Sequence, residues 1–230
     1  MDDLTSQALS FGTEIWKLDC LEVNLSVYPF IISVKNDTIK TRSVIISTGA
    51  EALWLNADRE SEFKGKGIST CATCDGFLFR NKSVIVIGGG DSAMEEANFL
   101  TKFASTVTII HRKETFKASK IMLNRVRNNP KIKFLLNSQV LEWSGSNNIL
   151  SGAVIKNILT NITEHIECDG AFIAIGHKPN TNFLHNQIEL HDNGYIKLFN
   201  NTMTSVPGVF ACEILLLFAI HYISNFVLRF

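Results

Sequence analysis

The sequence predicts an α/β protein built around a strand, a helix and a second strand, with a glycine-rich turn after the first strand. Residues 83–87 form a strand-like run, apolar from Val84 on, that ends in three glycines, and a second strand-like run follows at 107–110. Between them, residues 91–103 carry apolar side chains at helical spacing. Shorter strand-like runs lie on both sides. Parallel strands joined by a helix are typical of α/β proteins, which is the fold class expected here.

The remaining elements are predicted from turn residues and apolar runs. Upstream, a small antiparallel sheet leads into a buried strand at 43–47 and a connection at 52–69 that crosses between domains. Downstream, a second helix is expected at 116–127, because its apolar residues recur at helical spacing and Pro130 follows. The other expected strands are 14–18, 21–27, 30–34, 132–136, 140–143, 152–159, 165–168 and 171–175.

The composition favours a folded interior and disfavours several function classes. The 22 Lys and Arg residues balance 22 Asp and Glu residues, so no net charge draws the chain to nucleic acid or to an anionic membrane. Hydrophobic residues make up 46% and charged residues 19%, which disfavours disorder. Five cysteines are too few and scattered for a secreted disulfide scaffold, and the acidic start does not read as a signal peptide. We therefore expect a reducing compartment such as the cytoplasm.

Residues 88–93 read GGGDSA, which has the form G-x-G-x-x-A. In a dinucleotide-binding turn, the glycine at position 88 makes the tight turn and Gly90 lets a pyrophosphate approach the backbone. Ala93 is then the small residue that lets the helix pack on the strand. The flanking strand and helix supply the required context, so we predict dinucleotide binding; a glycine-rich turn without a ligand is the alternative.

The segment after the second strand, residues 111–117, reads HRKETFK. An acidic residue at this point would favour a free ribose 2′-hydroxyl. Instead, a histidine and three cations converge where the 2′-phosphate of NADPH would lie, so NADPH is preferred over NADH. The alternative is a solvated basic turn. The candidate residues are His111, Arg112, Lys113 and Lys117.

Cys71 and Cys74 form a C-x-x-C pair. A structural zinc site would need two further ligands, and the other cysteines and the histidines are not suitably grouped, so no metal is expected. A redox-active disulfide is favoured instead. Asp75 follows at once and is a candidate to hand a proton to a leaving thiolate. An acid that complements the first turn of a helix is the alternative interpretation of Asp75, and both can hold.

Three motifs follow one another along the chain: CATCDG at 71–76, VIGGGDSAMEEA at 86–97 and HRK at 111–113. In this combination the sequence resembles the low-molecular-weight NADPH-dependent thioredoxin reductases of bacteria and plants. The resemblance implies the two-dinucleotide-binding-domain flavoprotein disulfide reductase fold, with a nearly complete NADPH domain and a partial FAD domain. Four further segments agree with this family, namely 47–50, 174–180, 192–195 and 205–211.

The resemblance implies an enzyme that passes electrons from NADPH to FAD, then to the Cys71/Cys74 disulfide and on to thioredoxin. Cys74 would face the flavin, Cys71 would attack thioredoxin, and Asp75 would be the acid/base partner. A homodimer is also implied, with the mitochondrion as the alternative compartment for a full-length relative. The cofactor contacts carried over are Gly88, Gly90, Asp91, Ser92, Ala93, His111, Arg112, Lys113, Lys117, Ile175, Gly176, Thr48 and Gly49.

The resemblance also sets the expected domains. Residues 1–53 and 177–211 would be two remnants of the FAD-binding domain, and residues 54–176 would be the NADPH-binding domain with its C-x-x-C pair. Residues 212–230 are an apolar tail unlike the family. The lysines at 113 and 117 stand where the family usually has arginine, so the NADPH preference is expected to survive with weaker affinity.

The two ends of the chain depart from the family. The family's glycine turn for the FAD pyrophosphate has no counterpart after Met1, and its Gly-Asp segment and closing helix have none after Ala211. We therefore expect the chain as written not to hold FAD, and a truncated NADPH-binding protein without flavin or activity is the alternative function. The run at 214–230 is interpreted as a misjoined exon or read-through rather than a membrane anchor, because the sequence changes abruptly from a matching segment to unrelated apolar residues. The run has 17 residues, and a spanning helix needs about 20.

Overall fold

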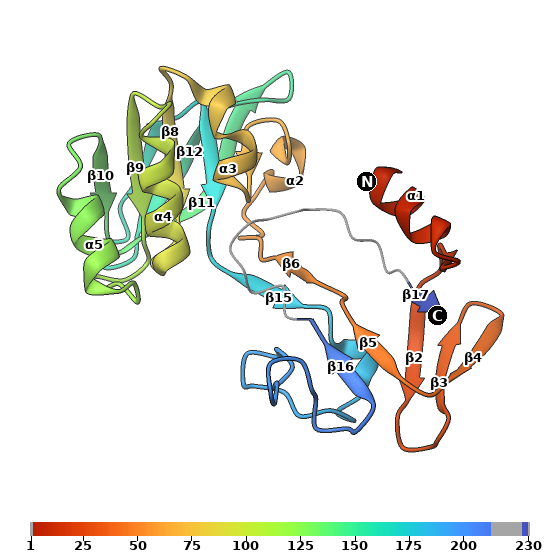
Figure 1. Ribbon diagram of the computed structural model, residues 1–230. Helices are drawn as coiled ribbons and strands as arrows, with labels where there is room; N and C mark the ends of the chain where they lie inside the picture. Colours follow the sequence, from red (N-terminus) through yellow and green to blue (C-terminus); the bar gives the residue numbers. More distant parts are fainter. Residues whose placement is uncertain (1, 213–226, 230) are drawn as a thin grey trace. The chain divides into compact units, whose positions relative to one another are not determined.

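The computed structural model describes residues 2–212 and 227–229 (Figure 1). The chain forms two compact units. One consists of Met1–Glu51 together with Lys178–Phe230, and the other consists of Ala52–His177. The second unit is continuous in sequence, and it contains the C-x-x-C pair, the glycine turn and the basic segment.

A five-stranded parallel sheet is the centre of the unit formed by residues 52–177. Two of its inner strands, β8 (Ser83–Ile87) and β14 (Gly170–Ile173), are buried along almost their whole length. Burial on both faces explains why these strands read as uninterrupted apolar runs. The strand order across the sheet is β10 (Ile132–Leu135), β9 (Thr106–Ile110), β8, β14 and β7 (Ile68–Ser69).

Alternate residues of β8 contribute to two different cores, because successive side chains of a strand point to opposite faces. Val84 and Val86 pack with the helical layer, whose apolar residues come mainly from α4 (Asp91–Leu100) and α5 (Lys120–Arg127). Ile85 and Ile87 pack on the other side against an antiparallel sheet. That sheet consists of β11 (Ser138–Ser146), β12 (Ile149–Asn157) and β13 (Thr163–Glu167), and the short helix α2 (Glu60–Phe63) lies against β11 (Figure 1).

The other unit has its own core under short strands. The strands β2 (Cys20–Asn24), β3 (Phe30–Val34) and β4 (Asp37–Thr41) form the expected antiparallel meander. Two segments far apart in sequence, β5 (Val44–Ile46) and β16 (Val209–Ala211), pair in parallel. The remaining elements are α1 (Asp2–Ser10), β1 (Glu14–Trp16), β6 (Ala50–Ala52), β15 (His177–Pro179), η2 (Asn182–Leu184) and β17 (Val227–Arg229), the last of which pairs with β1.

The second predicted helix begins later than the sequence suggested. It was expected from residue 116, but α5 begins at Lys120. The ring of Phe116 instead stacks on His111, with ring centroids 4.9 Å apart. The backbone N–H groups of Lys117 and Ala118 donate to the carbonyl oxygen of Gly89. These contacts therefore hold the first predicted turn in a non-helical form, and Ser119 caps the helix that follows.

Two other differences concern helix ends. The helix expected over 91–103 ends at Leu100, where Phe103 N–H donates three residues back to the Leu100 carbonyl and closes a tighter turn. The helix α1 was not predicted, because its sequence has few apolar residues and its two leucines are exposed.

The apolar run at 214–230 lies outside the described residues, apart from 227–229. The misjoined-exon interpretation of this run and its alternative, a membrane anchor, therefore both concern residues outside the described ranges. Among the helices of the described ranges, none has the length and apolar character needed to cross a membrane.

Candidate redox and nucleotide site

Three loops of the 52–177 unit leave the parallel sheet at the same edge. Cys71 follows β7, Gly88 follows β8, and His111 follows β9. Because these strands are parallel, their carboxyl ends lie on one side of the sheet. Ligands of open α/β sheets bind outside the carboxyl ends of the strands. The fold therefore gathers the predicted redox pair, glycine turn and basic segment at the edge where a ligand site is expected.

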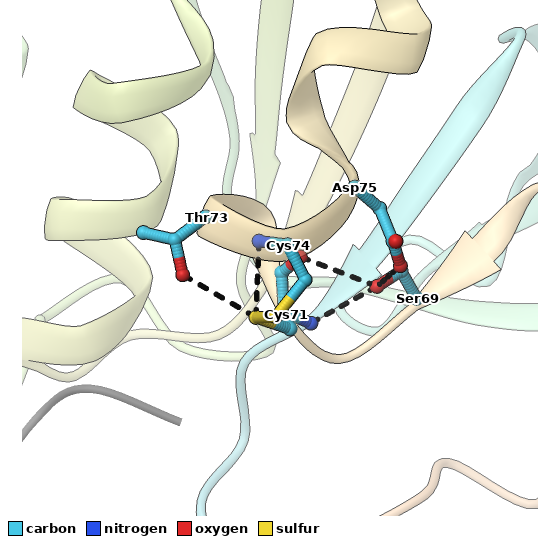
Figure 2. The surroundings of a disulfide bond; sticks show 5 residues. All are labelled: Ser69, Cys71, Thr73, Cys74 and Asp75. Atoms are coloured by element: carbon cyan, nitrogen blue, oxygen red, sulfur yellow. Dashed lines mark hydrogen bonds between the residues drawn. A yellow bond between two sulfur atoms is a disulfide. The ribbon is translucent and has the colours of Figure 1, made fainter. Parts of the chain in front are cut away.

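Cys71 and Cys74 are joined by a disulfide bond at the start of the short helix α3 (Ala72–Asp75) (Figure 2). Cys71 is the N-cap residue of this helix, and its sulfur accepts the backbone N–H of Cys74 at 3.2 Å. Only 6% of Cys71 is exposed, whereas Cys74 is an exposed residue. The disulfide can therefore be reached from solvent on the Cys74 side.

The carboxylate of Asp75 is held by Ser69, at the end of β7 (Figure 2). The Ser69 hydroxyl donates to Asp75 Oδ2 at 2.6 Å, and its oxygen accepts the N–H of Cys71 at 3.0 Å. One hydroxyl thus links the candidate acid to the backbone of the disulfide. Ser69 was not predicted from the sequence. The feature that could have identified it was its position at the end of a strand, two residues before Cys71.

Thr73 is a second hydroxyl residue that the sequence analysis missed. Its Oγ1 atom lies 3.3 Å from the sulfur of Cys71 (Figure 2). The sequence feature that could have identified Thr73 was its position inside the C-x-x-C motif, because a hydroxyl side chain between the two cysteines lies close to their sulfur atoms.

Gly88 and Gly90 have different surroundings in the turn before α4. A Cβ atom on Gly88 would collide with the carbonyl oxygen of Ala174 and would lie 2.7 Å from Cβ of Ala93. A Cβ atom on Gly90 would meet no atom within 4 Å. Gly88 therefore allows close packing of the turn against the strand and the helix. Gly90 borders open space, as a residue that a phosphate approaches should.

The N-terminus of α4 carries no side-chain cap, because its N-cap residue is Gly90. The carboxylate of Asp91 accepts the backbone N–H of Ser119 at 2.8 Å, and so ties α4 to the start of α5. Ser92 is exposed beside it. Uncapped N–H groups at the start of a helix suit an anion such as a pyrophosphate. Asp91 is thus placed to brace the turn.

The three predicted cations lie on the surface near the glycine turn. Arg112, Lys113 and Lys117 are exposed. The backbone N–H of Lys117 donates to Gly89 at 2.8 Å, which brings this lysine next to the turn. Within residues 2–212, the salt bridges formed do not involve any of the three cations. They can therefore serve an anionic ligand without first losing a carboxylate partner.

His111 shapes the site in a different way from these cations. Its ring covers Gly89, where a Cβ atom would collide with it, and stacks on Phe116. The pKa of His111 is lowered, mainly because the ring is partly buried. A hydrogen bond to the Thr115 carbonyl raises this pKa, whereas the charges of Arg112 and Lys113 lower it further. The ring is consequently neutral at pH 7, and Nε2 lies 3.1 Å from that carbonyl oxygen as a donor.

The other predicted cofactor residues lie in both units. Ile175 is 38% exposed after β14, and Gly176 has a φ of 113°, which favours glycine. In the 1–51 and 178–230 unit, Thr48 and Gly49 line a pocket together with apolar residues that include Ile46, Ile196 and Leu198. The described residues that line this pocket include no charged side chain. The lining of this pocket is therefore mostly apolar and uncharged.

A buried carboxyl group in α4 was not predicted. Burial is the main reason that the pKa of Glu96 is raised to about 8, and the negative charge of Glu95 is a second, smaller cause. Its Oε2 atom has no hydrogen-bond partner. Glu96 is therefore mostly protonated at neutral pH. In the described part of the chain, no group of histidines, cysteines and acidic residues is arranged to hold a metal ion.

Comparison with known proteins extends these observations. Residues 11–212 match the family described as pyridine nucleotide-disulphide oxidoreductase. The chain belongs to this family. The thioredoxin reductase of Rickettsia typhi is 44% identical over 215 residues, which cover 92% of this chain and 69% of the relative. Thioredoxin reductase 2 of Arabidopsis thaliana is 47% identical over 220 residues, which cover 92% of this chain and 57% of the relative.

Solved structures of this family have the same fold. The thioredoxin reductase from Giardia duodenalis matches with a TM-score of 0.80 and 36% identity, over 93% of this chain and 72% of that one. The thioredoxin reductase of Lactococcus lactis matches with a TM-score of 0.73 and 34% identity, and the chain spans 64% of its length. The predicted family and its two-dinucleotide-binding-domain fold are thereby confirmed.

Proposed function

We propose that this chain transfers electrons from NADPH to the disulfide of thioredoxin through the Cys71/Cys74 pair. The observation that carries the proposal is the common sheet edge. A disulfide, an uncapped glycine turn and three cations without ion-pair partners in the described ranges lie after three parallel strands of one unit. This arrangement supports a protein that binds a dinucleotide phosphate and exchanges thiols.

The disulfide exchange begins from the dithiol form. The thiolate of Cys71 attacks one sulfur of the thioredoxin disulfide, and the other thioredoxin sulfur leaves as a thiolate that takes up a proton. Cys74, once deprotonated, then attacks the Cys71 sulfur, which restores the Cys71–Cys74 bond and releases the second thioredoxin thiol. Two electrons move to thioredoxin in this sequence. Asp75, held by Ser69, lies next to Cys74 in the chain and is proposed to exchange the protons.

NADPH is proposed to bind across the glycine turn. The pyrophosphate would lie at the N-terminus of α4, near Gly90 and Ser92. The 2′-phosphate would accept charge-assisted hydrogen bonds from Arg112, Lys113 and Lys117. The neutral ring of His111 would then fix the shape of the surface between these two parts of the ligand.

FAD, when bound, accepts a hydride from NADPH and supplies two electrons to a disulfide. The pocket at Thr48 and Gly49 has no charged side chain in its lining among the described residues, which is compatible with the uncharged ring of such a group. The second candidate function is an NADPH-binding protein without flavin chemistry. Visible flavin absorbance after incubation with FAD and removal of the excess distinguishes the two candidates.

A protein partner is supported by the apolar residues beside the disulfide. Phe77 and Leu78, in the 3-10 turn η1 (Gly76–Phe79), are 53% and 57% exposed. Aromatic side chains such as Phe are enriched at the core of protein interfaces. They lie three and four residues after Cys74, so a bound thioredoxin would cover them during exchange.

A homodimer and a cytoplasmic location are proposed on the resemblance alone.

The disulfide exchange can be tested without a flavin. The full chain is reduced with dithiothreitol, freed of the reductant and mixed with oxidised thioredoxin, and the thiols of both proteins are counted by mass spectrometry after alkylation. We expect about one thioredoxin disulfide to be reduced per chain. The double variant C71S/C74S is the control. Reduction of thioredoxin by the control at the same rate would contradict the proposal.

A further inference from the structure

The sulfur of Cys71 receives two hydrogen-bond donors in the oxidised state. The backbone N–H of Cys74 lies 3.2 Å away, and the hydroxyl oxygen of Thr73 lies 3.3 Å away (Figure 2). A disulfide sulfur carries no hydrogen, so the Thr73 hydroxyl must be the donor. Both donors therefore point at one atom, and that atom gains negative charge when the disulfide is reduced.

The local backbone explains this geometry. Cys71 is extended at the N-cap position of α3, which directs its side chain back over the first turn. Thr73 is the second residue of that turn, and its hydroxyl bends toward the same side. The Thr73 residue is otherwise exposed, so replacing its side chain removes few contacts.

The surroundings of Cys71 make these donors important. Cys71 is 6% exposed, and burial disfavours a thiolate. The acidic groups on the elements packed here are Asp75 on α3 itself, and Glu95 and Glu96 on α4, which packs against α3. A negative charge on Asp75 would oppose a second one on the sulfur, whereas Glu96 is mostly protonated at neutral pH. The cation at the end of η1, Arg80, lies over the ring of Phe103. Hydrogen bonds to the sulfur would therefore help to stabilise an anion there.

We propose that Thr73 is a catalytic residue of disulfide exchange, whose hydroxyl donates a hydrogen bond to the thiolate of Cys71. This inference rests on the proposed function and adds a residue to it. When a hydride equivalent from NADPH reduces the Cys71–Cys74 bond, its two electrons and proton leave Cys74 as a thiol and Cys71 as a thiolate, and the hydroxyl stabilises that negative charge. When the thiolate attacks the thioredoxin disulfide, its electron pair forms the new bond, the charge passes to the leaving sulfur, and the Thr73 proton stays on its oxygen.

The test measures the reactivity of Cys71 directly. In the full chain carrying C74S, Cys71 is the one thiol left in the motif, and its alkylation by iodoacetamide is followed from pH 5 to pH 10 by peptide mass spectrometry. Resolving the peptides separates Cys71 from Cys20 and Cys212, and from Cys168, whose pKa is raised to about 12 by burial. The variants compared are T73V, which has the same shape without a hydroxyl, and T73S, which keeps the hydroxyl.

We expect T73V to lower the thiolate fraction of Cys71 at pH 7 about tenfold, and T73S to leave it within about twofold of the parent. Equal pH profiles for T73V, T73S and the parent would overturn the proposal. Circular dichroism establishes that each variant is folded, and T73A replaces T73V if the valine variant is not. Because the assay contains neither thioredoxin nor NADPH, its result is independent of the thioredoxin reduction experiment, and the two proposals can fail separately.

Discussion

The Ser69 hydroxyl donates a 2.6 Å hydrogen bond to the Asp75 carboxylate and also accepts the N–H of Cys71. This pair connects the end of β7 with the end of α3, on either side of the disulfide. Asp75 is thereby fixed in one orientation beside the redox pair. Its role as the proton-exchanging group depends on this orientation, so Ser69 acts as a positioning residue.

Replacing Ser69 should slow the exchange while the disulfide still forms. In S69A the Asp75 carboxylate loses its partner, and we expect thioredoxin reduction by the prereduced chain to slow by about five- to tenfold. S69T keeps the hydroxyl and is the matched control, with a rate near that of the parent. Stopped-flow mixing with oxidised thioredoxin measures the rates. If S69A and S69T are equally slow, loss of packing and not loss of the hydrogen bond explains the effect.

The basic segment predicts which nucleotide is bound. Removing Arg112 and Lys113 together should weaken NADPH binding by about tenfold or more, because two charge-assisted contacts to the 2′-phosphate are lost. NADH lacks that phosphate and should bind the variant and the parent alike. Calorimetric titration of both nucleotides measures the difference. Equal losses for NADPH and NADH would show that these residues do not read the 2′-phosphate.

His111 should affect NADPH binding through its shape. Because its pKa is lowered below the usual 6.5, the ring is neutral above that pH and adds no charge to the site. In H111F a neutral aromatic ring can still stack on Phe116, so we expect NADPH affinity at pH 7.5 to change by less than about threefold. Titration of R112A under the same conditions is the comparison. A loss in H111F as large as that in R112A would mean that His111 contacts the phosphate as a cation.

Glu96 makes the stability of the chain depend on pH. Its pKa is about 8 in the folded state, above the ordinary value of 4.5, so the folded chain holds a proton that the unfolded chain releases. Stability from this group is therefore greatest below about pH 4.5 and falls as the pH rises toward 8. E96Q removes this loss, and we expect it to be more stable than the parent at pH 8 by on the order of 1–3 kcal/mol.

Urea denaturation at pH 5.5 and pH 8 checks this prediction, with E95Q as the matched control because Glu95 is exposed on the same helix. The advantage of E96Q over the parent should grow between the two pH values, and E95Q should show a much smaller change. A constant difference between E96Q and the parent would mean that Glu96 does not titrate in this range.

The sequence was sufficient to predict the parts of the fold and of the site whose local geometry depends on residue type. The glycine turn was predictable because Gly88 has no room for a side chain, and the inner strands because burial on both faces requires apolar runs. The C-x-x-C pair was recognisable by its spacing. Family membership followed from the combination of these motifs and is supported by the match over residues 11–212.

Other features depended on contacts that the sequence does not encode locally. The helix α5 begins later than predicted because the backbone N–H groups of Lys117 and Ala118 donate to the carbonyl oxygen of Gly89, which follows a different strand, β8. The roles of Ser69 and Thr73 depend on which way a hydroxyl turns in a tight turn. Glu96 reads as one of two adjacent acids on a helix, and only its packing distinguishes it from the exposed Glu95.

Trapping the covalent complex between this chain and thioredoxin is the most direct test of the assignment of Cys71 as the attacking thiol. A thioredoxin variant with one active-site cysteine, activated as a mixed disulfide with thionitrobenzoate, is mixed with the full chain carrying either C74S or C71S. We predict a covalent complex with C74S, linked through Cys71, and much less with C71S. A complex formed only with C71S, through the more exposed Cys74, or with neither variant, would contradict the assignment of Cys71 as the attacking thiol.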